Sequence, residues 1–266
     1  MRIENISLRR LQIPLRFKFS QSNNSAQISD STILEIETSR GTIGFGECCP
    51  RPYVTGETFE SVKKDIEKIG WFLKKIEIND LASIQKLVCE VLPSKVGLST
   101  ICAVELAILD AFSKEYRLFL KDLLGIQHSK TIKYAGVIPI QNKLKLPYLL
   151  QQFSIFKFKE AKLKVGTDIE DSLEKIEIIR KYFKHVKTVR VDANCSWTYE
   201  DAVQQIPIYL KHDVRIFEQI FPKGMELEMG RITRQFGSEA KIMADESVTS
   251  LKSAKALINK KLCNRL

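Results

Sequence analysis

The second half of the sequence contains ionisable residues at a regular interval, each at the end of a short apolar segment. Such segments end near Gly136, Lys164, Asp192, Glu218 and Asp245, and a helical pattern follows each of them. From Lys164 onward the intervals are 28, 26 and 27 residues, the length of one strand–helix unit in a parallel α/β fold. Because the carboxyl ends of parallel strands meet at one edge, this spacing predicts that the four ionisable side chains line the mouth of a barrel.

The first half follows a different pattern, typical of an α+β domain. Three segments are predicted strands, the last two forming an antiparallel hairpin: residues 3–13, 32–38 and 42–47. Three later segments have helical periodicity: residues 58–75, 80–91 and 99–116. Residues 17–30 are polar and rich in Ser and Asn, which predicts a loop. We therefore expect an N-terminal α+β domain over residues 1–126 and an α/β (TIM-type) barrel domain over residues 127–266.

Two lysines precede the carboxylates along the chain. Lys162 and Lys164 are two residues apart in a predicted strand, so both ammonium groups are expected on one face. Asp192, Glu218 and Asp245 would form a site of oxygen ligands only, which suits Mg²⁺. Taken singly, a carboxylate at a strand end often caps the next helix, but three at one-unit spacing favour a metal site.

This combination of groups has an evident chemical use. A divalent ion would hold a substrate carboxylate and stabilise the charge that forms when a base removes the proton on the adjacent carbon. Lys164 is the predicted base, and like-charge repulsion from Lys162 would favour the neutral amine that a base requires.

These residues, together with several motifs, resemble the enolase superfamily. Within it the sequence is most similar to the mandelate racemase and muconate lactonizing subgroup, and there to the dipeptide epimerases. Residues 46–58 (GECCPRPYVTGET) are similar to the capping-domain loop that closes over substrate, and residues 103–111 (AVELAILDA) to the long capping helix. With residues 123–125, the Lys-x-Lys pair and the spaced Asp, Glu and Asp, the resemblance covers essentially the whole chain.

The resemblance implies a Mg²⁺-dependent racemase or epimerase that abstracts the α-proton of a carboxylate substrate, with L-Ala-D/L-Glu from cell-wall peptide turnover as the expected dipeptide. It assigns Lys164 as the base, Lys162 as its companion, and the three carboxylates as the metal ligands: Asp192, Glu218 and Asp245. It also suggests a set of substrate-binding residues in the two capping loops: Phe19, Arg51, Tyr53 and Thr55.

The sequence departs from the family at its end. The family's last three barrel strands, the second catalytic lysine on the sixth strand and the paired aspartates that hold the substrate's amino group are not found in these 266 residues. We therefore expect a C-terminally truncated barrel of about five of eight strands, inactive in two-base epimerisation. Two alternatives stay open. One is another activity of the subgroup, on an N-acylamino acid, a muconate-type lactone or a succinylbenzoate precursor. The other is a non-catalytic remnant or interaction module.

Composition limits the partners. The net charge is +10, but basic and acidic residues are interleaved, which is typical of solvated helix faces and disfavours nucleic-acid binding. No segment approaches the roughly 18 apolar residues needed to span a membrane. The six cysteines include no Cys-x-x-Cys pair and have no His at zinc-ligand spacing. These features predict a cytoplasmic protein that binds a small molecule and has the potential to form a homo-oligomer.

Overall fold

The computed structural model describes residues 1–21, 24–126, 131–140, 146–147, 150–151 and 155–266, apart from the side chains of residues 16–26. The chain divides into two compact units. The first contains Met1–Arg16 and Gln27–Lys130, and the second contains Phe17–Ala26 and Thr131–Leu266. The domain boundary expected between residues 126 and 127 stays a prediction, since residues 127–130 lie outside the described part of the chain.

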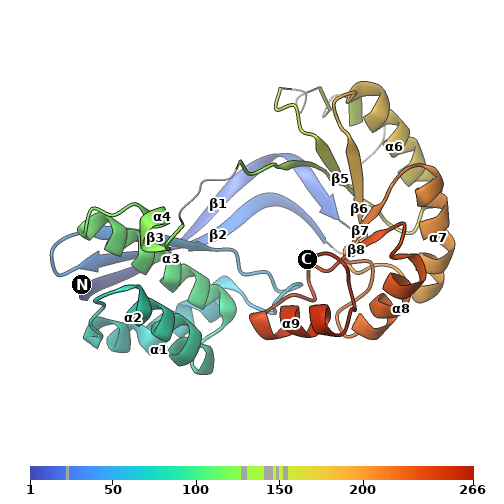
Figure 1. Cartoon of the computed structure of the whole chain (residues 1–266). Coiled ribbons are helices and arrows are strands. Elements are labelled where there is room, and N and C mark those ends of the chain that lie inside the picture. The colour runs from blue at the N-terminus through green and yellow to red at the C-terminus, as the bar shows by residue number, and fades with distance from the viewer. Residues whose placement is uncertain (22–23, 127–130, 141–145, 148–149, 152–154) are drawn as a thin grey trace. The chain divides into compact units, whose positions relative to one another are not determined.

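The first half of the chain forms a three-stranded sheet. The strands lie in the order β1(Ile3–Gln21), β2(Asn24–Thr38) and β3(Ile43–Cys48) (Figure 1). β2 and β3 are antiparallel, with Thr32 opposite Cys48 and Glu37 opposite Ile43, which confirms the predicted hairpin.

The loop predicted over residues 17–30 is wrong, because β1 and β2 extend through most of that segment. The polar composition of this segment is typical of a loop. Two strands that pair through backbone hydrogen bonds, however, do not need alternating apolar side chains. Arg10 on β1 strengthens this pairing by donating from Nε to Asp30 Oδ1 at 3.0 Å and from Nη2 to Asp30 Oδ2 at 2.6 Å.

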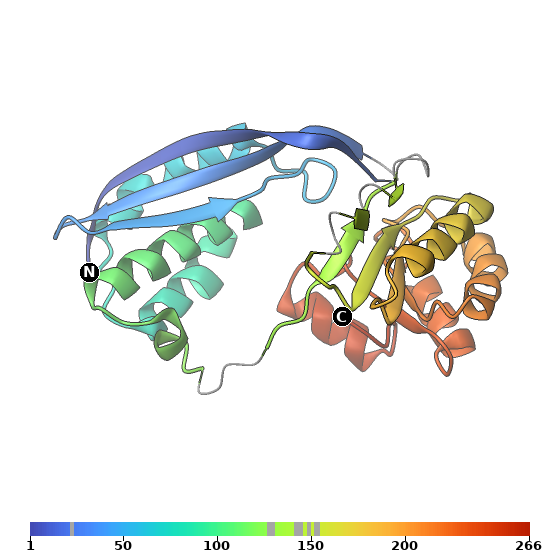
Figure 2. The ribbon, with the colours of Figure 1, turned by 90° about the horizontal axis from the view of Figure 1, so that it is seen from above.

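The helices of this unit lie on one face of the sheet (Figure 2). They are α1(Phe59–Lys75), α2(Leu81–Lys86), α3(Leu98–Glu115) and α4(Leu120–Leu123), with a π-helical turn at Leu87–Val91 and a 3₁₀ turn at Leu92–Ser94. Thr58 caps α1, where its side chain accepts from the Ser61 N–H, as expected for a helix beginning at this point. The predicted helices are thus confirmed to within a few residues at their ends.

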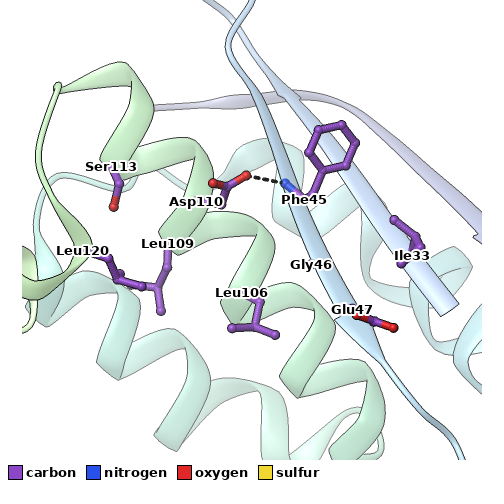
Figure 3. A pocket seen from close by; sticks show the side chains of 9 residues that line it. All are labelled: Ile33, Phe45, Gly46, Glu47, Leu106, Leu109, Asp110, Ser113 and Leu120. Atoms are coloured by element: carbon purple, nitrogen blue, oxygen red, sulfur yellow. Dashed lines mark hydrogen bonds between the residues drawn. The ribbon is translucent and has the colours of Figure 1, made fainter. Parts of the chain in front are cut away.

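Strand β3 crosses α3 by direct backbone contact. A Cβ placed on Gly46 would lie 1.9 Å from the carbonyl oxygen of Ala103, and one on Gly44 would lie 2.4 Å from that of Ala107. The Phe45 N–H between them donates to Asp110 Oδ2 at 2.8 Å, beside an apolar hollow of about 400 Å³ (Figure 3). The two glycines therefore allow the strand to approach the helix this closely.

Gly46→Ala is accordingly expected to destabilise this unit by about 1–3 kcal/mol, because the new methyl group meets backbone that has no rotamer to change. Urea unfolding followed by circular dichroism measures the loss. Gly70→Ala in α1 is the matched control: nothing lies within 4 Å of its Cβ position. It is expected to stabilise the helix by about 0.5–1 kcal/mol. Equal effects of the two variants would contradict the close packing of β3 on α3.

The second half of the chain forms a five-stranded parallel sheet. The strands follow in sequence order: β4(Ala135–Ile138), β5(Glu160–Lys164), β6(Thr188–Asp192), β7(Ile216–Glu218) and β8(Lys241–Met243). Beyond β8, Arg265 forms a parallel bridge with Met243. The predicted run of five parallel strands is confirmed.

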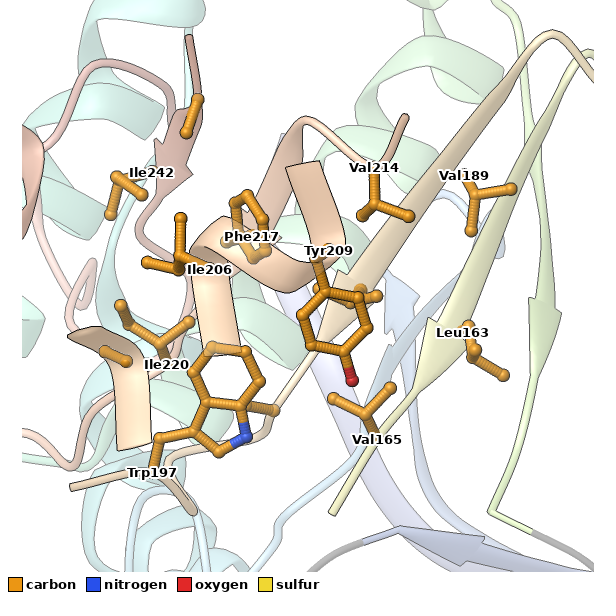
Figure 4. Packing of buried hydrophobic residues seen from close by; sticks show 14 of the residues in the cluster. Leu163, Val165, Val189, Trp197, Ile206, Tyr209, Val214, Phe217, Ile220 and Ile242 are labelled. Carbon is orange, nitrogen blue, oxygen red and sulfur yellow. The ribbon is translucent and has the colours of Figure 1, made fainter. Parts of the chain in front are cut away.

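Helices follow β5 to β8 in turn and lie against the outer side of this sheet (Figure 1). They are α6(Ile169–Tyr182), α7(Tyr199–Lys211), α8(Glu226–Phe236) and α9(Leu251–Asn259). The core between strands and helices is apolar and aromatic (Figure 4). Trp197 is 1% exposed at its centre and stacks on Tyr209 with ring centroids 5.9 Å apart. This core fixes the positions of the strand ends.

Candidate active site

Three of the predicted site residues are neighbours at the carboxyl edge of the parallel sheet. Lys164 pairs in register with Asp192, and Asp192 pairs with Glu218. All three side chains are buried, with Asp192 fully so. Asp245 lies two residues beyond Met243, the register partner of Glu218, and is exposed. The strand spacing therefore brings one lysine and two carboxylates into one row.

Lys162 lies between the two buried carboxylates. Its Nζ is 2.8 Å from Asp192 Oδ2 and donates to Glu218 Oε1 at 2.5 Å. Burial lowers the pKa of Lys162, but the charge of Asp192 and the hydrogen bonds to Asp192 and Glu218 outweigh this and raise it. The Lys162 ammonium is thus balanced by two anions, which weakens the repulsion of Lys164 expected from the sequence.

Lys164 is held by a different set of contacts. Its Nζ donates to Asn194 Oδ1 at 2.6 Å and lies 3.4 Å from Asp192 Oδ2. Asn194 adopts a left-handed backbone conformation with φ of 44°, and its N–H donates to Asp192 Oδ1 at 2.9 Å. Asn tolerates this conformation better than most residues, so the tight turn after β6 orients both Asp192 and Lys164.

Glu218 is flanked by two cations. Lys162 binds its Oε1, while Arg190 Nε lies 3.2 Å from its Oε2. Burial raises the pKa of Glu218, and the charge of Asp192 adds to this rise; the two cations oppose it without cancelling it.

Three residues of this site were not predicted from the sequence: Arg190, Asn194 and Gln219. The fully buried Gln219 accepts at Oε1 from the Asp245 N–H at 2.8 Å and from the Ser247 N–H at 3.2 Å. It therefore holds the turn that carries Asp245. Arg190 could have been predicted, because it lies two residues before Asp192 on the same strand and its side chain is therefore on the same face. No local pattern indicated Gln219, because its role depends on a hydrogen bond to the loop at Asp245, 26 residues further along the chain.

The predicted substrate-binding residues lie apart in sequence from this row. Arg51 is half-buried and its Nη1 donates to the carbonyl oxygens of Asp30 and Pro50 at 2.7 and 3.1 Å. Tyr53 and Thr55 are exposed on the turn that follows. Phe19 belongs to β1, but its side chain is outside the described residues. Their role in substrate binding stays a prediction.

The donor set at the sheet edge fits Mg²⁺. Asp192 and Glu218 offer carboxylate oxygens from adjacent strands, and the buried Glu218 Oε2 accepts no hydrogen bond from the residues that the structure describes. Oxygen ligands of this kind are those that Mg²⁺ prefers. In the described part of the chain, no three His, Cys, Asp or Glu side chains already converge as metal ligands would. Asp245 would have to join the two buried carboxylates to complete the set.

Comparisons with known proteins agree with the resemblance. Residues 149–266 match the family described as "Enolase C-terminal domain-like". The chain is 29% identical over 265 residues to the hydrophobic dipeptide epimerase of Enterococcus faecalis, covering 98% of the chain and 72% of that protein. It is 26% identical over 263 residues to the L-Ala-D/L-Glu epimerase of Bacillus subtilis, covering 96% of the chain and 69% of that protein.

Solved structures extend the similarity to the fold. The dipeptide epimerase from Enterococcus faecalis V583, complexed with Mg and L-Leu-L-Tyr, has a TM-score of 0.85 at 27% identity, covering 99% of this chain and 73% of that one. A substrate-liganded L-Ala-D/L-Glu epimerase from Bacillus subtilis has a TM-score of 0.88 at 23% identity, with 99% and 73% coverage. The two compact units and the parallel α/β sheet of this chain therefore have the fold of these structures. The chain is similar in sequence to dipeptide epimerases over nearly its whole length, and residues 149–266 match the enolase C-terminal family.

Every helix in the part of the chain that the structure describes is too short or too polar to cross a bilayer.

Proposed function

We propose that this chain is a Mg²⁺-dependent isomerase of the epimerase type, which removes the α-proton of a carboxylate substrate. The observation that carries the proposal is the row of Lys164, Asp192 and Glu218 in register at one edge of a parallel sheet. We also propose that the two compact units are the capping domain and the barrel domain expected from the sequence.

The chemistry follows from the positions of the two lysines. Asp192, Glu218 and Asp245 would hold Mg²⁺, which supplies positive charge beside the substrate carboxylate when bound. Lys164 Nζ takes the proton from the α-carbon, and the electron pair of the broken C–H bond is left on the substrate. Lys162 contacts both Asp192 and Glu218 and so helps to hold these two carboxylates in place. Return of a proton from Lys164 to the same carbon completes the exchange.

The proposed substrate is a dipeptide such as L-Ala-D/L-Glu. The related proteins described above are named as dipeptide epimerases, and one is complexed with L-Leu-L-Tyr. N-acylamino acids, muconate-type lactones and succinylbenzoate precursors are the competing substrates for the same proton-exchange assay.

We propose further that residues 1–266, assayed alone, exchange the α-proton but do not invert the carbon. Among the described strands, β5 alone carries lysines at its carboxyl end. A proton removed and returned by one lysine comes back to the same face of the carbon. Inversion of the second residue of a dipeptide by this chain would contradict this part of the proposal.

Thermal unfolding with and without Mg²⁺ tests the metal site. A ligand that binds only the native state stabilises it, by about 2.7 kcal/mol at a concentration 100 times its Kd. We expect Mg²⁺ to raise the Tm of the wild type and to leave that of Asp192→Asn unchanged. Asp213→Asn is the matched control, since this exposed carboxylate pairs with Arg215 away from the row. A Mg²⁺ effect that is absent from the wild type, or equal in Asp192→Asn, would contradict the proposal.

A further inference from the structure

Arg190 connects the candidate site to the amino end of the sheet. It lies on β6 two residues before Asp192, so both side chains are on the same face of the strand. Its Nη2 is 3.2 Å from Glu160 Oε1 on β5, and its Nη1 donates to Met243 Sδ on β8 at 3.3 Å. The guanidinium is therefore fixed by groups from both sides of its own strand.

The contact between Arg190 and Glu218 is unlike the other contacts of that carboxylate. Lys162 donates a hydrogen bond to Glu218 Oε1, whereas Arg190 Nε lies 3.2 Å from Oε2 in a geometry that is not a hydrogen bond. Oε2 is buried, and no described residue donates a hydrogen bond to it. Arg190 thus attracts this oxygen through its charge, and no hydrogen bond from a described residue competes with a cation for it.

We propose that Arg190, anchored by Glu160, is a positioning residue that orients Glu218 for a divalent cation. The inference rests on the proposed function and extends it to a residue outside the proposed set of metal ligands. Partners that orient a metal ligand in this way typically change metal affinity 10–100-fold when they are removed.

The sign of the effect distinguishes positioning from charge. A positive charge 3.2 Å from a ligand oxygen repels a cation, so removal of Arg190 would strengthen Mg²⁺ binding if charge alone mattered. Positioning predicts the opposite result. We expect Arg190→Met to bind Mg²⁺ about 10–100-fold more weakly than the wild type in isothermal titration with MgCl₂.

Two further variants keep the test independent of folding. Arg190→Lys retains the charge but lacks the planar guanidinium, whose separate nitrogens reach Glu160 and Glu218 together. We therefore expect Arg190→Lys also to bind Mg²⁺ more weakly than the wild type. Glu160→Gln should weaken binding less, and should have no added effect in the Arg190→Met background, because Glu160 acts only through Arg190. Circular dichroism without Mg²⁺ identifies the folded variants.

These measurements distinguish a failure of the inference about Arg190 from a failure of the proposed function. Unchanged or tighter Mg²⁺ binding by folded Arg190 variants, with binding by the wild type, would contradict the inference and leave the proposed function intact. Absence of Mg²⁺ binding by the folded wild type would contradict the proposed function, and the inference with it. Additive effects of Glu160→Gln and Arg190→Met would overturn the role given to Glu160.

Discussion

Replacement of Lys164 by alanine is expected to lower the rate of α-proton exchange about 10²–10⁴-fold, the contribution typical of a positioned general base. Lys164 Nζ is buried at the sheet edge, where Asn194 Oδ1 accepts from it at 2.6 Å. No other described strand offers a lysine at this edge that could replace it. The measurement is the loss of the dipeptide's α-proton signal in D₂O, followed by ¹H NMR in the presence of Mg²⁺.

The matched control is Lys175→Ala. Lys175 is also a buried lysine of the same unit, but it lies on α6 and pairs with Asp171 of that helix. It is expected to retain the exchange rate of the wild type even if the variant is less stable. Exchange that survives in Lys164→Ala, or that is lost equally in both variants, would exclude Lys164 as the base.

Trp197→Ala is expected to destabilise the second unit by about 3–5 kcal/mol, the range for removing a large aromatic side chain from a core. Trp197 stacks on Tyr209, lies 6.4 Å from the ring of Phe217, and donates from Nε1 to the Gly166 carbonyl at 3.1 Å. Its loss removes both packing and a buried hydrogen bond. The shift of the urea midpoint, followed by circular dichroism, measures the effect.

Trp71→Ala is the matched control, because it removes an indole ring from an exposed position instead of a buried one. Trp71 is 69% exposed on α1, where its ring contacts Lys75 Nζ at 3.8 Å from the centroid. Substitutions at such exposed positions usually change stability by no more than about 0.5 kcal/mol. Similar losses in the two variants would contradict the structural role given to Trp197.

The order of the parallel strands was predictable because the repeat length is a property of the chain itself. A strand, a helix and two loops need a similar number of residues each time, so the ionisable strand ends recur at nearly constant intervals. The same regularity predicted that Lys164, Asp192 and Glu218 would be neighbours. It did not predict that Asp245 would be exposed, because Asp245 follows β8 by two residues, in a turn held by Gln219.

Side-chain partners were less predictable than strand positions. Lys162 and Lys164 were predicted to share one face because they are two residues apart in a strand. Only the packed sheet determines that Lys162 binds two carboxylates while Lys164 donates to Asn194. The loop predicted over residues 17–30 is wrong for a related reason. Its polar side chains give no strand pattern, although β1 and β2, which pair through backbone hydrogen bonds, extend into this segment. Both cases depend on contacts between residues distant in sequence, which local patterns do not encode.

Exchange of a substrate α-proton by the wild-type chain tests the proposed proton abstraction at this sheet edge most directly. L-Ala-L-Glu is incubated in D₂O with the folded protein, with Mg²⁺ or with EDTA, and the α-proton of the second residue is followed by ¹H NMR. We expect this signal to decay with Mg²⁺ and to persist with EDTA. A signal that persists at saturating Mg²⁺, across dipeptides and the competing substrates, would contradict the claim that this sheet edge is a proton-abstraction site.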